Sequence, residues 1–384
     1  MNSKLAIVGA LALLTLLVAH AAGTSPRAVP HTHPVLAPER PVIEAVFVLD
    51  TTGSMSGLIE GAKQKIWSVA NQMASGTPTP DVRIGLIGYR DRGDAYVTRR
   101  HDLTGDIDAI YAQLQALQAG GGGDTPESVN QALHEAVQHM SWTPGQRVYK
   151  VIFLVGDAPP HMDYQDDVPF TKSVALAARH GIVINTVQCG GMPATTPVWR
   201  QIASAGSGRY VAIRQDGGMV AMTTPHDEDL ARLNRALGDT VVAWGEASER
   251  AEIEAKRGRA LAADAPAAAS RLAYFAKTGG KVNSGRADLI DAVKEGAVDP
   301  KDLDADALPE PLRNLSPAER ESFVQQKLEQ RERIQQEIVA VSKKRDAFVA
   351  EEQARRAAAG EADGFDQQVL GAIRSQAAAK GISY

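Results

Sequence analysis

Apolar runs alternate with amphipathic stretches over the first two thirds of the chain. The apolar runs have the length and the Val, Ile and Leu content of buried strands, and they lie at residues 42–50, 82–89, 149–156, 182–188 and 209–213. Between them, apolar residues recur every three or four positions, as on one face of a helix, at residues 58–73, 106–119, 126–141, 170–180 and 199–205. Residues 227–244 repeat this spacing and are expected to be the closing helix. The order predicts an α/β fold with a doubly wound, mostly parallel sheet.

One predicted strand is of a different kind. Residues 96–103 alternate polar and apolar side chains and follow a short turn at residues 91–94. Strands joined by such a short connection run antiparallel, and a strand with one polar face suits a sheet edge. We therefore expect one antiparallel edge strand beside the strand at 82–89.

The composition changes near residue 246. Ala, Glu and Arg dominate from there on, and no strand-like run appears, so the remainder is predicted to be helical. Ser316, Pro317 and Glu319 have the spacing of a helix start with a capping box. Because residues 318–359 contain neither Gly nor Pro, we expect one long helix there and a shorter one within 365–384.

The long helix carries a short apolar stripe. Ile334, Ile338 and Val341 keep a spacing of three or four residues, and Arg345 interrupts it. Packing against the α/β unit, self-association of the 318–359 helix as a coiled coil, and docking of a partner protein all fit such a stripe. The sequence leaves these three roles open.

The N-terminal segment has the layout of a secretory signal peptide. Lys4 precedes an apolar run at residues 5–18, and residues 19–21 form an A-x-A cleavage site. The run is shorter than the roughly 20 residues of a membrane span, so an uncleaved inner-membrane anchor is the alternative. We expect an exported protein, periplasmic or secreted, that contacts a membrane only if this segment stays uncleaved.

These observations divide the chain into five segments. They are a signal peptide at 1–21, a Pro-rich linker at 22–41, an α/β domain at 42–245, a helical connector at 246–315, and a long helix with a helical tail at 316–384.

Charge and cysteine content limit the chemistry. The formal net charge is −5 over 384 residues, which argues against nucleic acid as a partner, because phosphates attract basic surfaces. Cys189 is the only cysteine, which excludes an internal disulfide.

Oxygen-bearing side chains follow the first predicted strand. Asp50 ends that strand, and Thr52 and Ser54 place hydroxyls two and four residues later, on either side of Gly53. Hydroxyl and carboxylate oxygens are the ligands that hard cations such as Mg²⁺ prefer. Asp, Thr and Ser also occur in ordinary turns, so this motif alone would be weak.

Two further loops strengthen the prediction of a cation site. Thr125 follows the glycine run 120–123, and Asp157 ends the apolar run 149–156. The carboxyl ends of parallel strands meet at one edge of a sheet, where ligands bind at the point of strand-order reversal. We therefore expect the three loops to converge.

With these residues, the chain resembles the von Willebrand factor A domain and its metal-ion-dependent adhesion site. That site has the pattern D-x-[ST]-x-S, a loop Thr and a distal Asp, and the matching residues are Asp50, Thr52, Ser54, Thr125 and Asp157. The resemblance covers residues 42–245, and the layout with a helical tail resembles secreted bacterial A-domain proteins.

The resemblance implies a role for each matching residue. Thr52 and Ser54 would bind the metal directly, and Thr125 would complete the shell. Asp50 and Asp157 would act mainly through bound waters. The implied ion is Mg²⁺, with Mn²⁺ or Ca²⁺ as alternatives, and an Asp or Glu carboxylate of a protein partner would fill the last coordination position.

The segment after Asp157 adds a second hypothesis. Residues 161–167 contain His161, Tyr164 and three aspartates. This loop is expected either to shape partner selectivity or to hold an auxiliary cation, and a solvated loop is the alternative.

The sequence lacks the usual signs of catalysis. There is no H-E-x-x-H motif, the glycine run 120–123 lacks the G-K-[ST] ending of a P-loop, and Ser54 is already assigned to the metal. We expect an exported, cation-dependent binding module of the adhesion type rather than an enzyme. The alternative is a structural or assembly factor of the cell envelope that acts through its helical tail, with the A domain as scaffold.

Overall fold

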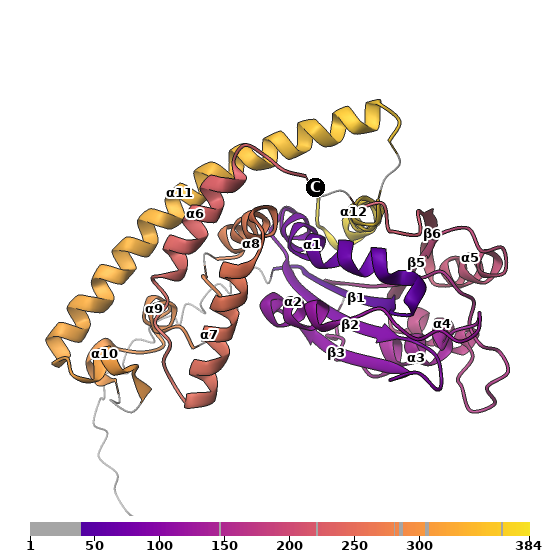
Figure 1. The fold of residues 1–384 in the computed structure, drawn as a ribbon, viewed down its shortest axis with the longest axis horizontal. Helices are drawn as coiled ribbons and strands as arrows, with labels where there is room; N and C mark the ends of the chain where they lie inside the picture. The colour runs from indigo at the N-terminus through magenta and orange to yellow at the C-terminus, as the bar shows by residue number, and fades with distance from the viewer. Residues whose placement is uncertain are drawn as a thin grey trace, which may run out of the picture. The chain divides into compact units, whose positions relative to one another are not determined.

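A sheet of six strands organises the α/β part of the molecule (Figure 1). The strands are β1 (Val42–Asp50), β2 (Asp81–Tyr89), β3 (Thr98–Thr104), β4 (Val148–Gly156), β5 (Ile182–Cys189) and β6 (Ser207–Ile213). Their order is β3-β2-β1-β4-β5-β6, and β3 pairs antiparallel with β2 at one edge while the other pairs are parallel. The predicted fold class, including the antiparallel edge strand, is confirmed.

This computed structural model describes residues 40–145, 147–219, 222–279, 281–283, 287–303, 307–361 and 364–384. The predicted signal peptide at 1–21 and nearly all of the predicted linker at 22–41 lie outside these ranges. The predicted domain limits stay predictions.

The helices alternate with the strands and then continue alone. They are α1 (Ser56–Met73), α2 (Ile107–Ala116), α3 (Val129–Gln138), α4 (Phe170–Arg179), α5 (Thr195–Ala205), α6 (Asp227–Gly238), α7 (Ala247–Ala262), α8 (Ala265–Lys277), α9 (Leu289–Lys294), α10 (Glu310–Arg313), α11 (Pro317–Ala358) and α12 (Phe365–Ala377).

Alternating side chains of each strand supply two cores, one on each face of the sheet. Val46 and Val48 of β1 pack with α3, α4 and α5. Phe47 and Leu49 of the same strand pack with α1 and α2 on the opposite face. This period of two is what a strand buried on both faces requires.

The C-terminal helix α12 covers the sheet beside α1 (Figure 1). Val369 and Ile373 are fully buried in the same core as Phe47. At its C-terminal end, Gln376 accepts a hydrogen bond from the hydroxyl of Tyr149 on β4 and exchanges two hydrogen bonds with the side chain of Asn185 on β5. The segment that we expected only as a tail is therefore part of the sheet core.

The helix expected at 227–244 does not close the sheet; it packs against other helices instead. It ends at Gly238, and Leu230, Leu233 and Leu237 form a separate core with α8 and α11. The spacing of apolar residues shows that a helix has a buried face but not what covers that face.

The long helix α11 matches the prediction closely. It has 42 residues, which corresponds to about 63 Å, and Ser316 and Glu319 form the expected capping box. Its predicted stripe packs within the chain, because Ile338 is buried against α6 and α8. Arg345 interrupts the apolar stripe as expected; it is buried, and its Nε lies 2.7 Å from Oδ1 of Asp227 of α6. Self-association through this helix stays a prediction.

A buried ion pair joins the helical region to the helices of the sheet. Arg271 of α8 donates to both carboxylate oxygens of Asp108 on α2, at 2.9 and 3.2 Å. It also donates to the carbonyl of Val282 and the side chain of Asn283. Because all of its polar neighbours are acceptors, the buried guanidinium is well satisfied.

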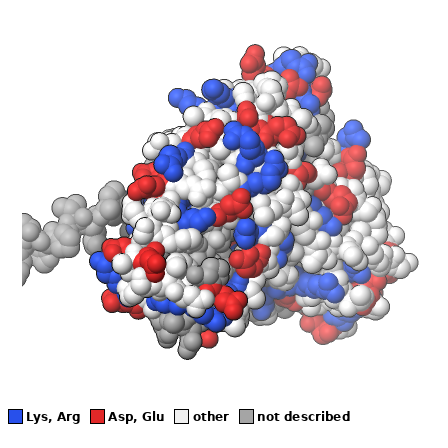
Figure 2. All heavy atoms as spheres, turned by 60° about the vertical axis from the view of Figure 1, so that its left-hand side comes forward, with Lys and Arg blue, Asp and Glu red and all other residues white. Residues whose placement is uncertain are grey.

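The surface carries charges of both signs. On the face shown in Figure 2, Lys and Arg are interspersed with Asp and Glu. Elsewhere and on this face alike, exposed ion pairs contribute little to stability; one example in the molecule is Lys301 with Glu321 at 3.1 Å. Within the described ranges, none of the helices combines the length and the hydrophobicity that crossing a bilayer requires.

The position of α12 gives a stability prediction. Ile373→Ala should lower the free energy of unfolding by about 2–5 kcal/mol, because it leaves a cavity beneath the sheet. Ser375→Ala on the exposed side of the same helix is the matched control and should change it by less than about 0.5 kcal/mol. Urea denaturation of the full chain measures both. Equal midpoints for the two variants would contradict the assignment of α12 to the core.

Candidate metal centre

The loop after β1 gathers the first three predicted residues. Thr52 donates two hydrogen bonds to Oδ1 of Asp50, from its amide at 2.8 Å and from its hydroxyl at 2.6 Å. The hydroxyl of Ser54 lies 3.3 Å from that of Thr52. Asp50 is fully buried, and its Oδ2 has no hydrogen-bond partner. An acceptor oxygen is therefore left buried and unpaired in the middle of the cluster.

The glycine run holds the second loop against the first. The amide of Gly120 donates to the carbonyl of Thr51, and the amide of Gly53 donates to that of Gly121. Gly121 has φ of +79°, and a Cβ there would lie 2.2 Å from Oδ1 of Asp94. Only glycine accepts both this conformation and this approach. Gly121 is thus required for the two loops to meet in this way.

Glu127, which follows the second loop, brings another carboxylate to the centre. Its side chain is 3% exposed, and its Oε2 has no hydrogen-bond partner. Its backbone pairs with the third loop, since its amide donates to Pro159 and its carbonyl accepts from His161. Burial raises the pKa of Glu127 to about 9, and the neighbouring carboxylates of Asp50 and Asp91 add to the increase.

Asp157, directly after β4, completes the cluster. Its Oδ2 accepts a hydrogen bond of 2.7 Å from Gln215, whose Nε2 also donates to the carbonyl of Ser54 at 3.2 Å. A Cβ on the preceding Gly156 would lie 3.0 Å from Cβ of Asp50, so the third loop passes directly beside the first. The loops therefore converge, as the strand ends predict.

The cluster has an excess of negative charge. Burial raises the pKa of Asp50 to about 7; the hydrogen bonds from Thr52 oppose this increase, and the carboxylate of Asp157 adds to it. Across the ranges that the structure describes, no Lys or Arg side chain forms an ion pair with Asp50, Glu127 or Asp157. Buried carboxylates ordinarily face a cationic group or a metal ion. The donor set of carboxylates and hydroxyls fits a hard divalent cation.

The structure brings together four of the five predicted ligands, namely Asp50, Thr52, Ser54 and Asp157. Thr125 lies exposed in the second loop, and the hydrogen bonds found among the described residues do not join its side chain to the other four. Glu127 was missed by the sequence analysis. Carboxylates are common just before helices, because they interact favourably with the helix N-terminus. The position of Glu127 in the sequence therefore gave no sign that it could also be a metal ligand.

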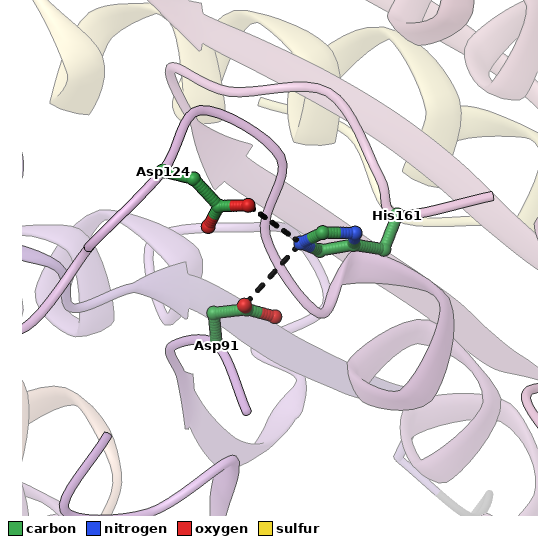
Figure 3. A group of neighbouring side chains, drawn as sticks. All are labelled: Asp91, Asp124 and His161. Atoms are coloured by element: carbon green, nitrogen blue, oxygen red, sulfur yellow. Dashed lines mark ion pairs between the residues drawn. The ribbon is translucent and has the colours of Figure 1, made fainter. Parts of the chain in front are cut away.

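A second group of side chains lies near the third loop (Figure 3). Nε2 of His161 points between Asp91, at 3.3 Å, and Asp124, at 3.7 Å. Two aspartates of the acidic loop are used elsewhere, because Asp166 and Asp167 both pair with Arg92. Of the acidic loop, only His161 and its direct neighbours therefore remain candidates for an auxiliary cation site.

Comparison with known proteins identifies the sheet region. Residues 44–222 match the family model of the von Willebrand factor A domain. The human von Willebrand factor A domain-containing protein 7 is 37% identical over 120 residues, which are 31% of this chain and 12% of that protein. The alpha-protein kinase vwkA of Dictyostelium discoideum is 26% identical over 125 residues, which are 31% of this chain and 19% of that protein.

The similarity is confined to one segment. That segment covers less than a fifth of the length of each of these two relatives. Among solved structures, the SpRpn10 VWA domain is similar to 45% of this chain over 88% of its own, with 17% identity and a TM-score of 0.34. The family match, the strand order and the loops after β1 and β4 agree. Residues 44–222 of this chain are a von Willebrand factor A domain.

Proposed function

We propose that this protein binds a protein partner through a divalent cation held at the metal centre. The observation that carries the proposal is the pair of buried, unpartnered oxygens, Oδ2 of Asp50 and Oε2 of Glu127, in a cluster to which the described part of the chain contributes no paired Lys or Arg. A divalent cation would neutralise this cluster. The hydroxyls of Thr52 and Ser54 and the carboxylates of Asp50, Glu127 and Asp157 are the groups that would hold it.

Mg²⁺ is the ion that we expect, with Mn²⁺ or Ca²⁺ as alternatives. Mg²⁺ takes oxygen ligands and keeps part of its water shell, which suits neutral hydroxyls and water-bridged carboxylates. Ser54 is exposed while Thr52 and Asp50 are buried, so the centre is open to solvent on one side. On that side an Asp or Glu carboxylate of the partner would complete the coordination, through a charge-assisted contact.

The wider proposal is that of an exported binding module without catalytic activity. It is supported by the apolar N-terminal run with its A-x-A motif and by the absence of a catalytic motif from the sequence. The alternative is an envelope structural or assembly factor that acts through its helices α6 to α12. Partner binding should depend on the cation if the protein is a binding module of this kind, and it should not depend on the cation if the helices α6 to α12 bind the partner.

The first prediction concerns pH. The raised pKa of Asp50 means that the folded protein binds more protons than the unfolded chain between the ordinary value of 3.8 and about 7. Metal-free protein should therefore lose stability as the pH rises from 6 to 8, and bound Mg²⁺ should offset this loss. We expect the increase in Tm caused by 5 mM MgCl₂ to be larger at pH 8 than at pH 6. The Asp50→Asn variant should lose most of this difference, and an equal shift at both pH values in the unsubstituted chain would contradict the prediction.

A second prediction concerns the ligands. Calorimetric titration with MgCl₂ should show at least about tenfold weaker binding for Asp50→Asn and for Glu127→Gln, since each loses a negative charge at the cation. Thr125→Val should have a smaller effect than Glu127→Gln, because Thr125 is not joined to the cluster. Asp229→Asn on the exposed side of α6 is the control and should bind as the unsubstituted chain does. A larger loss for Thr125→Val would restore Thr125 as the ligand and remove Glu127.

A third prediction concerns the partner. Proteins of the cell envelope that the immobilised full chain retains in MgCl₂ should be released by EDTA and should not be retained by Asp50→Asn. Mass spectrometry compares the proteins retained under the three conditions. A protein that is retained equally in all three would refute cation-dependent capture and favour the helical region as the binding surface.

A further inference from the structure

We propose a second cation site, formed by Asp91, Asp124 and His161, that takes a transition-metal ion of the Zn²⁺ type. One ligand atom of each residue lies within 4.8 Å of the other two, which is a span that one ion can bridge. The residues come from three segments: Asp91 from the turn after β2, Asp124 from the loop before α3, and His161 from the loop after β4. Figure 3 shows the imidazole directed between the two carboxylates.

The environment of His161 is the main evidence that this group binds a metal ion. It is 6% exposed, and its Nδ1 lies 2.8 Å from Oδ1 of Asp163. In the neutral imidazole, a proton on Nδ1 that is donated to this carboxylate leaves the lone pair on Nε2. Nε2 is buried and has no hydrogen-bond partner. Carboxylates that orient an imidazole in this way are typical of histidines that bind metals.

The three inward-facing groups are all acceptors. Nε2 of His161 has a lone pair, and Asp91 and Asp124 present carboxylate oxygens at 3.3 and 3.7 Å. With a neutral imidazole none of these atoms can donate to another, so the group needs a positive charge among its members, either a proton on Nε2 or a metal ion.

Neighbouring side chains hold two of the ligands in place. Asp91 accepts hydrogen bonds of 2.9 Å from Ser128 at Oδ1 and from Tyr164 at Oδ2. The ring of Tyr164 stacks on that of His161, with 4.1 Å between the centroids. The amide of His161 is bonded to the carbonyl of Glu127. Such support fixes the ligands before an ion arrives, which favours binding.

The donor set selects the kind of ion. An imidazole nitrogen with two carboxylates suits Zn²⁺ and similar transition metals, whereas Mg²⁺ and Ca²⁺ prefer oxygen alone. The two carboxylates balance the charge of a divalent ion. Three protein ligands leave one position of a tetrahedral ion open. Asp124 is largely exposed, so that position can be reached from solvent.

This site is distinct from the metal centre of the proposed function. It uses none of the residues that would hold Mg²⁺, and its ligands differ in chemistry. The two sites share only the loops that carry them, since Glu127 lies between Asp124 and Ser128 in sequence. The test can therefore be made in a chain whose first centre is disabled.

The experiment measures Zn²⁺ binding by the full chain carrying Asp50→Asn, after removal of metals with EDTA and dialysis. Competition with a chromophoric zinc chelator gives the affinity and the number of ions bound. We expect one tightly bound Zn²⁺. Adding Asp124→Asn or His161→Gln should weaken it at least about tenfold. Adding Asp166→Asn, which removes a carboxylate of the same loop that pairs with Arg92, should leave it unchanged.

Two results would overturn the proposal. One is the absence of a tight Zn²⁺ site in the Asp50→Asn chain, which would mean that His161 and the aspartates simply pair with one another. The other is an equal affinity for Zn²⁺ in the Asp50→Asn chain and in the chain that carries both Asp50→Asn and Asp124→Asn. Asp124 is exposed, so this substitution should not disturb folding, and circular dichroism in EDTA verifies that for every variant.

Discussion

Like charges buried together are the constraint on which the metal centre depends. Asp50 ends β1 and Asp157 directly follows β4, the neighbouring parallel strand, and the loop before α3 brings Glu127 beside them. The strand order reverses at this pair, so the loops diverge above it and leave room for a ligand. Repulsion between the carboxylates opposes the closed arrangement unless a proton or a cation is bound. The cation that we propose would therefore stabilise the fold, as in other sites where a cation completes a cluster of acidic groups.

The helical region is held by a different kind of electrostatic contact. Arg271, Arg331 and Arg345 are buried, and each faces aspartates that are distant in sequence. Such pairs contribute little net stability compared with apolar packing, but removing one partner leaves an uncompensated charge. The pairs therefore specify which helices lie together. Arg271 with Asp108 joins α8 to α2, so the helices after the sheet are part of the same structure.

The sequence predicts the strands well, and it predicts that Asp50, Thr52 and Ser54 lie together, because both patterns are local. Apolar runs of limited length define strands, and the spacing of Asp50, Thr52 and Ser54 lies within one loop. The sequence shows that Arg345 interrupts the apolar stripe of the long helix. It does not show that Asp227 pairs with Arg345, because the two residues are 118 positions apart. The role of α12 was missed for the same reason. Its apolar face is visible in the sequence, but the sheet surface that it covers was expected to be closed by residues 227–244.

The separation between β6 and α12 has a consequence for how the molecule forms. About 150 residues lie between the end of β6 and the start of α12, so a ribosome that adds roughly 5–20 residues per second needs about 8–30 s to make them. During that interval one face of the sheet lacks the helix that later buries Phe47 and Phe153. Until residues 365–377 have been synthesised, the apolar side chains of this face lack part of their packing, so α12 can dock only after the strands exist.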